Sequence, residues 1–170
     1  MRSVRPVYIG VEAAIVLHMA GETDDIDAID LRILRALGAD ARLSMAALAA
    51  QAGLSKSPTQ ARVKRLERLG VIRGYGARLD HARLGLGHIA YVQVSLSDTR
   101  SAALEAFNAA VRDAPGIVEC CMIAASFDYL LKVRTRDIAA YRRLLGEVIS
   151  ALPHVAQTST FVVMEAVKEA

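Results

Sequence analysis

The stretch LSKSPTQARVKRLERLGVIRG, residues 54–74, decides how the rest of this chain is organised. It predicts one helix that begins at Ser55 and ends at Gly70. The hydroxyl of Ser55 can accept a hydrogen bond from the first backbone N–H groups. Pro58 is tolerated in the first turn because its missing N–H would have no partner within the helix. Gly70 supplies the left-handed residue with which helices commonly end.

The predicted helix has an apolar face and a basic face. Spacings of four, three and three residues gather a stripe that suits a small core, made of Thr59, Val63, Leu66 and Leu69. The opposite face holds Ser57, Gln60, Ala61, Lys64 and Arg68, with Arg65 on its flank. A DNA recognition helix needs such donors and charges for base edges and phosphates. A solvated basic surface helix has the same pattern, so the neighbouring elements must decide.

Two helices are predicted upstream of the basic helix. Apolar residues at helical spacing from Ile26 to Leu37 mark the first, which follows a group of acids and is closed by Gly38. The second begins near Ser44, and residues 52–55 form a tight turn into the basic helix. Helix, short glycine turn and helix is the helix-turn-helix arrangement, and the first helix completes a three-helix core. This context favours DNA binding over a solvated surface helix.

The chain is predicted to contain four segments. An N-terminal extension (1–23) has an apolar part too short to span a bilayer. A helix-turn-helix domain (24–76) follows, and its last part, Val71 to Tyr75, is predicted as a short strand, or wing. A linker with glycine turn signals (77–87) leads to a second domain (88–170).

The second domain alternates strand and helix signals. Strands are predicted at 89–96, 117–124, 129–134 and 155–167, and helices at 99–114 and from Asp137 through Ile149. The second and third strands lie so close in the sequence that a hairpin is expected. The order β-α-β-β-α-β is the ferredoxin-like arrangement, an α+β fold with both helices on one face of the sheet. Because the strands are apolar on both sides, the uncovered face is expected to pair with a second copy.

Composition limits the classes of function. The chain has 21 basic and 18 acidic residues and a net charge of +3, which excludes a large basic surface but not a local patch. A hydrophobic content of 54% indicates an ordered globular chain with surfaces buried between subunits. Cys120 and Cys121 are adjacent in a predicted strand, so their side chains point to opposite faces and no disulfide is expected. This cysteine usage favours the reducing cytoplasm.

From Ile26 to roughly Lys168 the chain resembles bacterial and archaeal regulators of the leucine-responsive / asparagine-operon (Lrp/AsnC) type. The residues that carry the resemblance are IDLRILRALGADARLSMAALA (29–49), GLSKSPTQARVKRLERLGVIRGYGARLD (53–80), LG (84–85), FDYLLKVRTRD (127–137) and LPHV (152–155). The resemblance implies an N-terminal DNA-binding domain and a C-terminal ferredoxin-like domain. The second domain of such regulators dimerises, often assembles further to tetramers or octamers, and senses amino acids. Residues 122–136 and 154–168 are most similar to regulators of proline catabolism.

The resemblance also implies which residues contact double-stranded DNA. The family's recognition helix falls on residues 55–69. The expected contacts to bases or phosphates are Ser55, Ser57, Thr59, Gln60, Arg62, Lys64, Arg65, Arg68 and Arg73. Helical spacing places Thr59 and Arg62 toward the core side of this helix.

An amino-acid effector site is implied near the turn before the third strand. The corresponding residues are Ala124, Ala125, Ser126 and Asp128, and Ala125-Ser126 replaces the family's usual Gly-Asp pair. The carboxylate of an amino acid could use backbone N–H donors there, while Asp128 meets its ammonium group. The alternative is a turn variant in a domain that binds no ligand.

Three other functions compete with an effector-responsive regulator. The four histidines lack metal-ligand spacing, and no phosphate loop or nucleophile turn appears, so no enzymatic activity, cofactor or metal is expected. The sheet lacks the basic and aromatic signature of single-stranded RNA binding. An effector-independent architectural DNA-binding protein shares every residue except the ligand turn and stays open as the alternative. The sequence therefore predicts a cytoplasmic, homo-oligomeric transcription regulator on nucleoid DNA that has no membrane partner.

Overall fold

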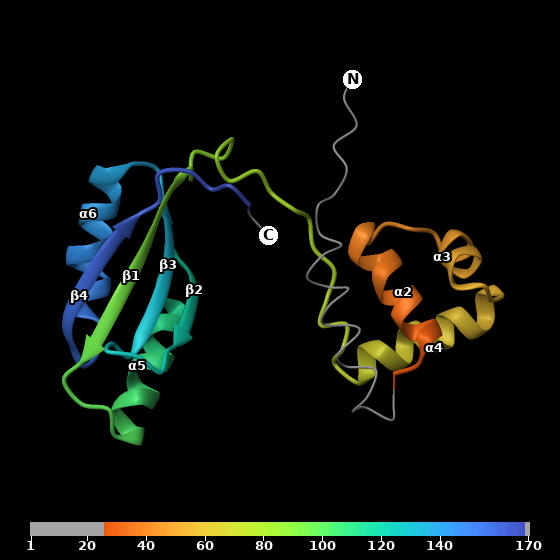
Figure 1. Ribbon diagram of the computed structural model, residues 1–170, viewed down its shortest axis with the longest axis horizontal. Helices are drawn as coiled ribbons and strands as arrows, with labels where there is room; N and C mark the ends of the chain where they lie inside the picture. Colours follow the sequence, from red (N-terminus) through yellow and green to blue (C-terminus); the bar gives the residue numbers. More distant parts are fainter. Residues whose placement is uncertain (1–25, 169–170) are drawn as a thin grey trace. The chain divides into compact units, whose positions relative to one another are not determined.

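The computed structural model describes residues 26–168, and three helices lie in the N-terminal part of this range (Figure 1). They are α2 (Ala28–Ala39), α3 (Met45–Ala52) and α4 (Lys56–Arg68). The chain divides between Arg78 and Leu79, so we call residues 26–78 the helical unit and residues 79–168 the sheet unit. The predicted N-terminal extension, residues 1–23, lies outside the described residues.

Buried side chains from all three helices form one core, and the predicted three-helix arrangement is confirmed. Ile33 of α2, Leu48 of α3 and Leu66 of α4 are almost fully buried in it. The hydroxyl of Ser44 accepts a hydrogen bond from the backbone N–H of Ala47 at 3.2 Å, which satisfies a first-turn donor of α3. The sequence therefore encodes both the packing and the start of this helix.

Glycines end the two helices of the helix-turn-helix. Gly53 after α3 and Gly70 after α4 have φ angles of 74° and 72°, the left-handed region that side chains disfavour. The predicted end of α4 is thus confirmed. Gly38, in contrast, lies inside α2, because the backbone N–H of Asp40 still bonds to the carbonyl of Ala36 at 2.9 Å. The prediction that Gly38 closes this helix is wrong.

The segment after α4 is not the strand that the sequence predicts. The backbone N–H groups of Val71 and Ile72 both bond to the carbonyl of Leu66, at 3.0 and 3.1 Å, and Ile72 packs against the helical core. The segment is therefore held by the helix it leaves, and no strand occurs among residues 26–78. A strand needs a neighbour to complete its hydrogen bonds, and the described part of this unit supplies none.

The sheet unit has the predicted β-α-β-β-α-β order. Its elements are β1 (His88–Leu96), α5 (Ser101–Asp113), β2 (Ile117–Met122), β3 (Tyr129–Thr135), α6 (Ile138–Glu147), the 3₁₀ turn η1 (Ile149–Ala151) and β4 (Val155–Val162). The strands lie in the order β2-β3-β1-β4, and every neighbouring pair is antiparallel. The predicted ferredoxin-like fold and its β2–β3 hairpin are confirmed.

Both helices of the sheet unit cover the same face of the sheet (Figure 1). Phe107 of α5 packs its ring 4.4 Å from that of Tyr129 in β3. Tyr141 of α6 joins the same core, and its hydroxyl is hydrogen-bonded to the hydroxyl of Thr160 in β4. Alternation along β1 puts Ala90, Val92 and Val94 on this face.

Three sequence predictions for the sheet unit need correction. The last strand ends at Val162 rather than at residue 167, because its neighbour β1 has already reached its first residues there. Ile149 lies in η1 rather than in α6. The uncovered face is not uniformly apolar, since Gln93 and Lys132 point to it, and Lys132 forms an ion pair with Glu119 at 3.2 Å.

Candidate DNA-binding helix and effector loop

Helix α4 has one buried face and one exposed polar face. Thr59, Val63 and Leu66 are buried against the rest of the helical unit. The residues left exposed on α4 and at its start include Ser55, Lys56, Ser57, Gln60, Lys64 and Arg68. One turn separates Lys64 from Arg68, so both positive charges lie on one outward face. The spacing predicts this separation of a buried stripe from an exposed basic face, except that Leu69, the last residue of the predicted stripe, is 45% exposed.

Thr59 does not belong to the exposed face. Its side chain is fully buried, and its hydroxyl donates a hydrogen bond to the carbonyl of Ser55 at 2.8 Å. The predicted cap at Ser55 does not form, because the side chain of Ser55 makes no hydrogen bond to the first turn of α4. Burial of this side chain argues against the predicted DNA contact of Thr59.

Arg62 points toward α2 instead of toward solvent. Its Nη1 atom lies 2.6 Å from Oδ2 of Asp27 and 2.9 Å from Oδ1 of Asp30. Nη1 of Arg65 lies 3.2 Å from the other oxygen of Asp30, whose side chain is 1% exposed. The expected DNA contact of Arg62 is not supported, because its guanidinium already serves two carboxylates. Asp30 was missed from the sequence, although its place three residues after a helix-capping Asp was a usable signal.

Electrostatics at the start of α2 follow from these contacts. The backbone N–H of Asp30 and then the guanidinium of Arg62 hold the pKa of Asp27 below its ordinary value of 3.8. Hydrogen bonds from Arg62 to Asp30 and to Asp27 raise the pKa of the Arg62 guanidinium. The charged form of each group is thus favoured in the folded helical unit.

We expect acid to weaken the contribution of Asp27 to stability. A carboxyl with a lowered pKa stabilises the fold above its unfolded pKa, and this contribution is lost as the pH falls through the folded pKa. In Asp27→Asn the side chain keeps an oxygen that can cap α2 but loses its charge, which is worth about 0.2–1 kcal/mol for a half-exposed pair. Thermal melts of the full chain, followed by circular dichroism from pH 7 to pH 2, would measure this. The thermal midpoint of the wild type should be higher than that of the variant at neutral pH, and the two midpoints should converge below pH 3.8. An equal gap at every pH would contradict this assignment.

The segment after α4 is fastened to the helix through Tyr75. Its hydroxyl donates a hydrogen bond to Oε1 of Glu67 at 2.8 Å. Partial burial and this carboxylate raise the pKa of Tyr75 to about 12, so the phenol keeps its proton at neutral pH. Arg73, the last of the expected DNA contacts, is exposed between Ile72 and Tyr75.

The loop between β2 and β3 brings the expected effector residues together. Ala124, Ala125 and Ser126 are exposed at its tip. The backbone N–H of Ile123 donates to the carbonyl of Asp128 at 2.8 Å and closes the loop at its base. A ligand would therefore meet small side chains and exposed backbone at this tip.

Asp128 has a structural contact that the sequence did not reveal. Its Oδ2 atom accepts a hydrogen bond from the backbone N–H of Leu96 at 2.7 Å. This contact falls where the ladder between β1 and β4 is irregular, between Ser95 and Leu96. The backbone N–H of Asp128 also donates to the carbonyl of Val94 at 3.0 Å. One carboxylate oxygen thus fastens the loop to β1, and Oδ1 is the oxygen that could meet an ammonium group.

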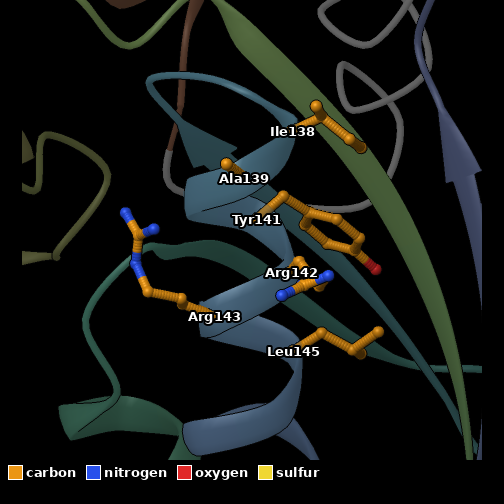
Figure 2. Close-up of a pocket in the computed structure, with 6 residues that line it drawn as sticks. All are labelled: Ile138, Ala139, Tyr141, Arg142, Arg143 and Leu145. Atoms are coloured by element: carbon orange, nitrogen blue, oxygen red, sulfur yellow. The ribbon is translucent and has the colours of Figure 1, made fainter.

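An open hollow lies along α6, away from the predicted effector loop (Figure 2). Ile138, Tyr141 and Leu145 point to one side of the helix, whereas Arg143 points to the other. Ile138, at the start of α6, is 59% exposed. The hydroxyl of Tyr141 already bonds to Thr160, and the lining is therefore largely apolar.

Neither a cluster of metal ligands nor a helix that could span a membrane occurs within residues 26–168. Within this range, His, Cys, Asp and Glu form no group of three or more that could hold a metal ion. None of the described helices is long and apolar enough to cross a membrane.

Comparisons with known proteins match both units. Residues 26–73 match the family described as winged helix-turn-helix DNA-binding, and residues 89–170 match the Lrp/AsnC ligand binding domain. The chain is 58% identical over 147 residues to a proline dehydrogenase transcriptional activator of Rhodobacter capsulatus, covering 86% of this chain and 96% of that protein. It is 45% identical over 145 residues to the leucine-responsive regulatory protein of Salmonella typhimurium, covering 85% and 88%.

A solved structure agrees with these relatives. A transcriptional regulator of Neisseria meningitidis, crystallised as a complex with L-methionine, superposes with a TM-score of 0.79 at 30% identity. The match covers 85% of this chain and 93% of that one. Fold, helix-turn-helix and sequence agree, and the chain belongs to the Lrp/AsnC family of DNA-binding transcription regulators.

Proposed function

We propose that this regulator reads double-stranded DNA by placing the exposed face of α4 in the major groove. The observation that carries this proposal is the separation of α4 into a buried stripe and an exposed polar face. Ser57 and Gln60, near the start of the helix, contact base edges. Lys64, Arg68 and Arg73 contact phosphates, which fixes the register of the helix on the duplex. The place of action is the cytoplasm, where the DNA lies.

The DNA-reading form is a homodimer or a larger assembly, up to an octamer. One short helix reads too few base pairs to be selective by itself, whereas two paired helices read half-sites about 34–36 Å or multiples of that apart. The uncovered face of the sheet carries Tyr91, Leu130 and Phe161, and Phe161 is 53% exposed. A second copy of this face would remove these apolar groups from water.

A small amino acid is the effector, and it binds at the loop that contains residues 124–128. Exposed backbone at Ala125 and Ser126 offers N–H donors to the ligand carboxylate, and Oδ1 of Asp128 accepts from its ammonium group. Support comes from the ligand-binding domain that residues 89–170 match and from the related regulator crystallised with L-methionine.

Proline is the first effector to test, and a proline dehydrogenase gene is the first target. Two relatives with 58% and 57% identity carry the name proline dehydrogenase transcriptional activator. Their matches extend over 86% and 87% of this chain, so they include both units. The proposal is thus a regulator whose DNA binding or assembly changes when proline is abundant.

We expect proline to raise the thermal midpoint of the full chain and to change its affinity for DNA upstream of a proline dehydrogenase gene. A ligand at a hundred times its Kd stabilises the folded state by about 2.7 kcal/mol. The measurement is a thermal-shift screen over all amino acids, followed by gel-shift titrations of the upstream DNA with and without proline. Asp128→Asn keeps an oxygen for the backbone N–H of Leu96 but loses the charge, so it should fold normally and lose the response.

The outcomes separate the two functions that stay open. If a different amino acid shifts the thermal midpoint and proline does not, the proposal of an effector site at residues 124–128 is retained, with that amino acid as its ligand. If no amino acid changes the midpoint, the assembly size or the DNA affinity, the effector-independent architectural function takes the place of the regulator proposed here.

A further inference from the structure

We propose that Asp30 is a positioning residue for DNA recognition, which fixes the pose of α4 and keeps Arg62 and Arg65 off the phosphates. This inference rests on the proposed role of α4 as the DNA-reading helix. It divides the basic residues of α4 into two groups with different tasks. Arg62 and Arg65 hold the helix, and Lys64 and Arg68 bind the duplex.

The carboxylate of Asp30 joins two helices from a buried position. Its Oδ1 atom accepts from Nη1 of Arg62 at 2.9 Å, and its Oδ2 atom accepts from Nη1 of Arg65 and from the backbone N–H of Asp27, both at 3.2 Å. The side chain is 1% exposed. A buried carboxylate without partners would be strongly disfavoured, so these contacts resist being exchanged for contacts to water or DNA.

Asp27 completes the cluster on the more exposed side. Its Oδ2 atom accepts from Arg62 at 2.6 Å, and its Oδ1 atom accepts from the backbone N–H groups of Ile29 and Asp30 at 2.8 and 2.9 Å. All four carboxylate oxygens of the cluster are therefore engaged. Two acids and two bases balance each other in charge, so the cluster adds no net positive charge to the DNA-reading surface.

The cluster supplies an orientation that the apolar core alone does not. Val63 and Leu66 pack against Ile33, and such contacts tolerate small rotations of the helix about its axis. Arg62 and Arg65 lie on the α2-facing flank of α4, and hydrogen bonds to fixed oxygens accept a narrower range of angles. Rotation of α4 would carry Gln60 and Lys64 away from the positions in which they meet the groove. Selectivity for sequence, more than overall affinity, should depend on Asp30.

The experiment compares Asp30→Asn, Arg62→Lys and Lys64→Ala in the full chain. A duplex selected by the wild type from a random library serves as the specific probe, and a scrambled duplex of equal length serves as the other. Fluorescence anisotropy at several salt concentrations gives both affinities and the slope of log K against log salt for each. Circular dichroism at the same temperature verifies that α4 is folded.

We expect Asp30→Asn to reduce the ratio of specific to scrambled affinity at least tenfold, while the scrambled duplex binds as tightly as before or more tightly. Because the variant removes one negative charge beside α4, the magnitude of the salt slope should stay unchanged or rise. Arg62→Lys keeps the charge but loses the fixed directions in which the rigid guanidinium aims Nη1 at both carboxylates, so it should lower the same ratio at an unchanged slope. Lys64→Ala should instead weaken both duplexes and reduce the magnitude of the slope by about one.

Each result decides something about Asp30 or about α4. If Asp30→Asn is folded and keeps the wild-type ratio, the positioning role is overturned. If Asp30→Asn loses helical content, the test passes to Arg62→Lys. An unchanged ratio of specific to scrambled affinity in Arg62→Lys then overturns the positioning role of Asp30. A loss of about one in the magnitude of the salt slope in Arg62→Lys would place Arg62 on a phosphate and also overturn it. If Lys64→Ala alters neither duplex, the proposed use of α4 fails before the question about Asp30 arises.

Discussion

Replacing both Lys64 and Arg68 by alanine should weaken binding to every duplex and reduce the magnitude of the salt slope by about two. Both side chains are exposed on the outward face of α4, one helical turn apart. Each phosphate contact releases condensed counterions, so its loss lowers the dependence of affinity on salt by about 0.9. Titrations of the full chain with a labelled duplex between 50 and 300 mM salt would measure this change.

The matched control removes the same charge from another helix. Arg32 and Arg35 are exposed on α2 of the same unit, and their replacement by alanine lowers the net charge equally. The slope should stay at its wild-type value in that control. A similar decrease in both double variants would mean that DNA responds to the total charge of the unit and not to the face of α4.

Leu66→Ala should unfold much of the helical unit and abolish DNA binding. Leu66 is fully buried in the core that joins α4 to α2 and α3. Such a truncation costs about 2–5 kcal/mol, whereas a unit of about 50 residues has only roughly 3–8 kcal/mol of stability. Urea denaturation followed by circular dichroism should show the first transition at a much lower urea concentration, with the transition of the sheet unit retained.

Leu69 provides the control for this variant. It ends the same helix and is 45% exposed, so Leu69→Ala removes the same atoms with little change in buried area. The urea midpoint and the DNA affinity should then remain close to those of the wild type. If the two variants lose urea midpoint and DNA affinity equally, the effect comes from the loss of a leucine from the helix and not from the loss of core packing.

Much of the fold could be predicted because its signals are local. The cap at Ser44 and the left-handed Gly70 act through neighbouring backbone groups, so a single sequence contains what is needed to identify them. The predicted end of α2 was wrong because glycine can adopt the left-handed conformation that ends a helix but can also remain helical, as Gly38 does. The strand at Val71 to Tyr75 was wrong because hydrogen bonds to Leu66 and packing on the helical core, not apolar composition, decide its conformation.

For the DNA-binding helix, the sequence could predict which face is exposed but not which partners the side chains contact. Helical spacing separated Lys64 and Arg68 from the core without knowledge of any neighbour. The partners of Arg62 lie more than thirty residues away in the sequence, and only the packing of α4 on α2 brings them within 2.6 and 2.9 Å. The contact between Asp128 and Leu96 likewise depends on the pairing of distant strands.

The bond between Tyr75 and Glu67 also limits the tether between the two units. It holds the chain to α4 as far as Tyr75, so the freely extended part of the connection begins only after this residue. A turn begins at Asp80, whose carbonyl accepts a hydrogen bond from the backbone N–H of Leu84 at 3.2 Å. Only residues 76–79 lie between Tyr75 and this turn, and four residues extend over roughly 14 Å at most. The connection between the units is therefore shorter in reach than its number of residues suggests.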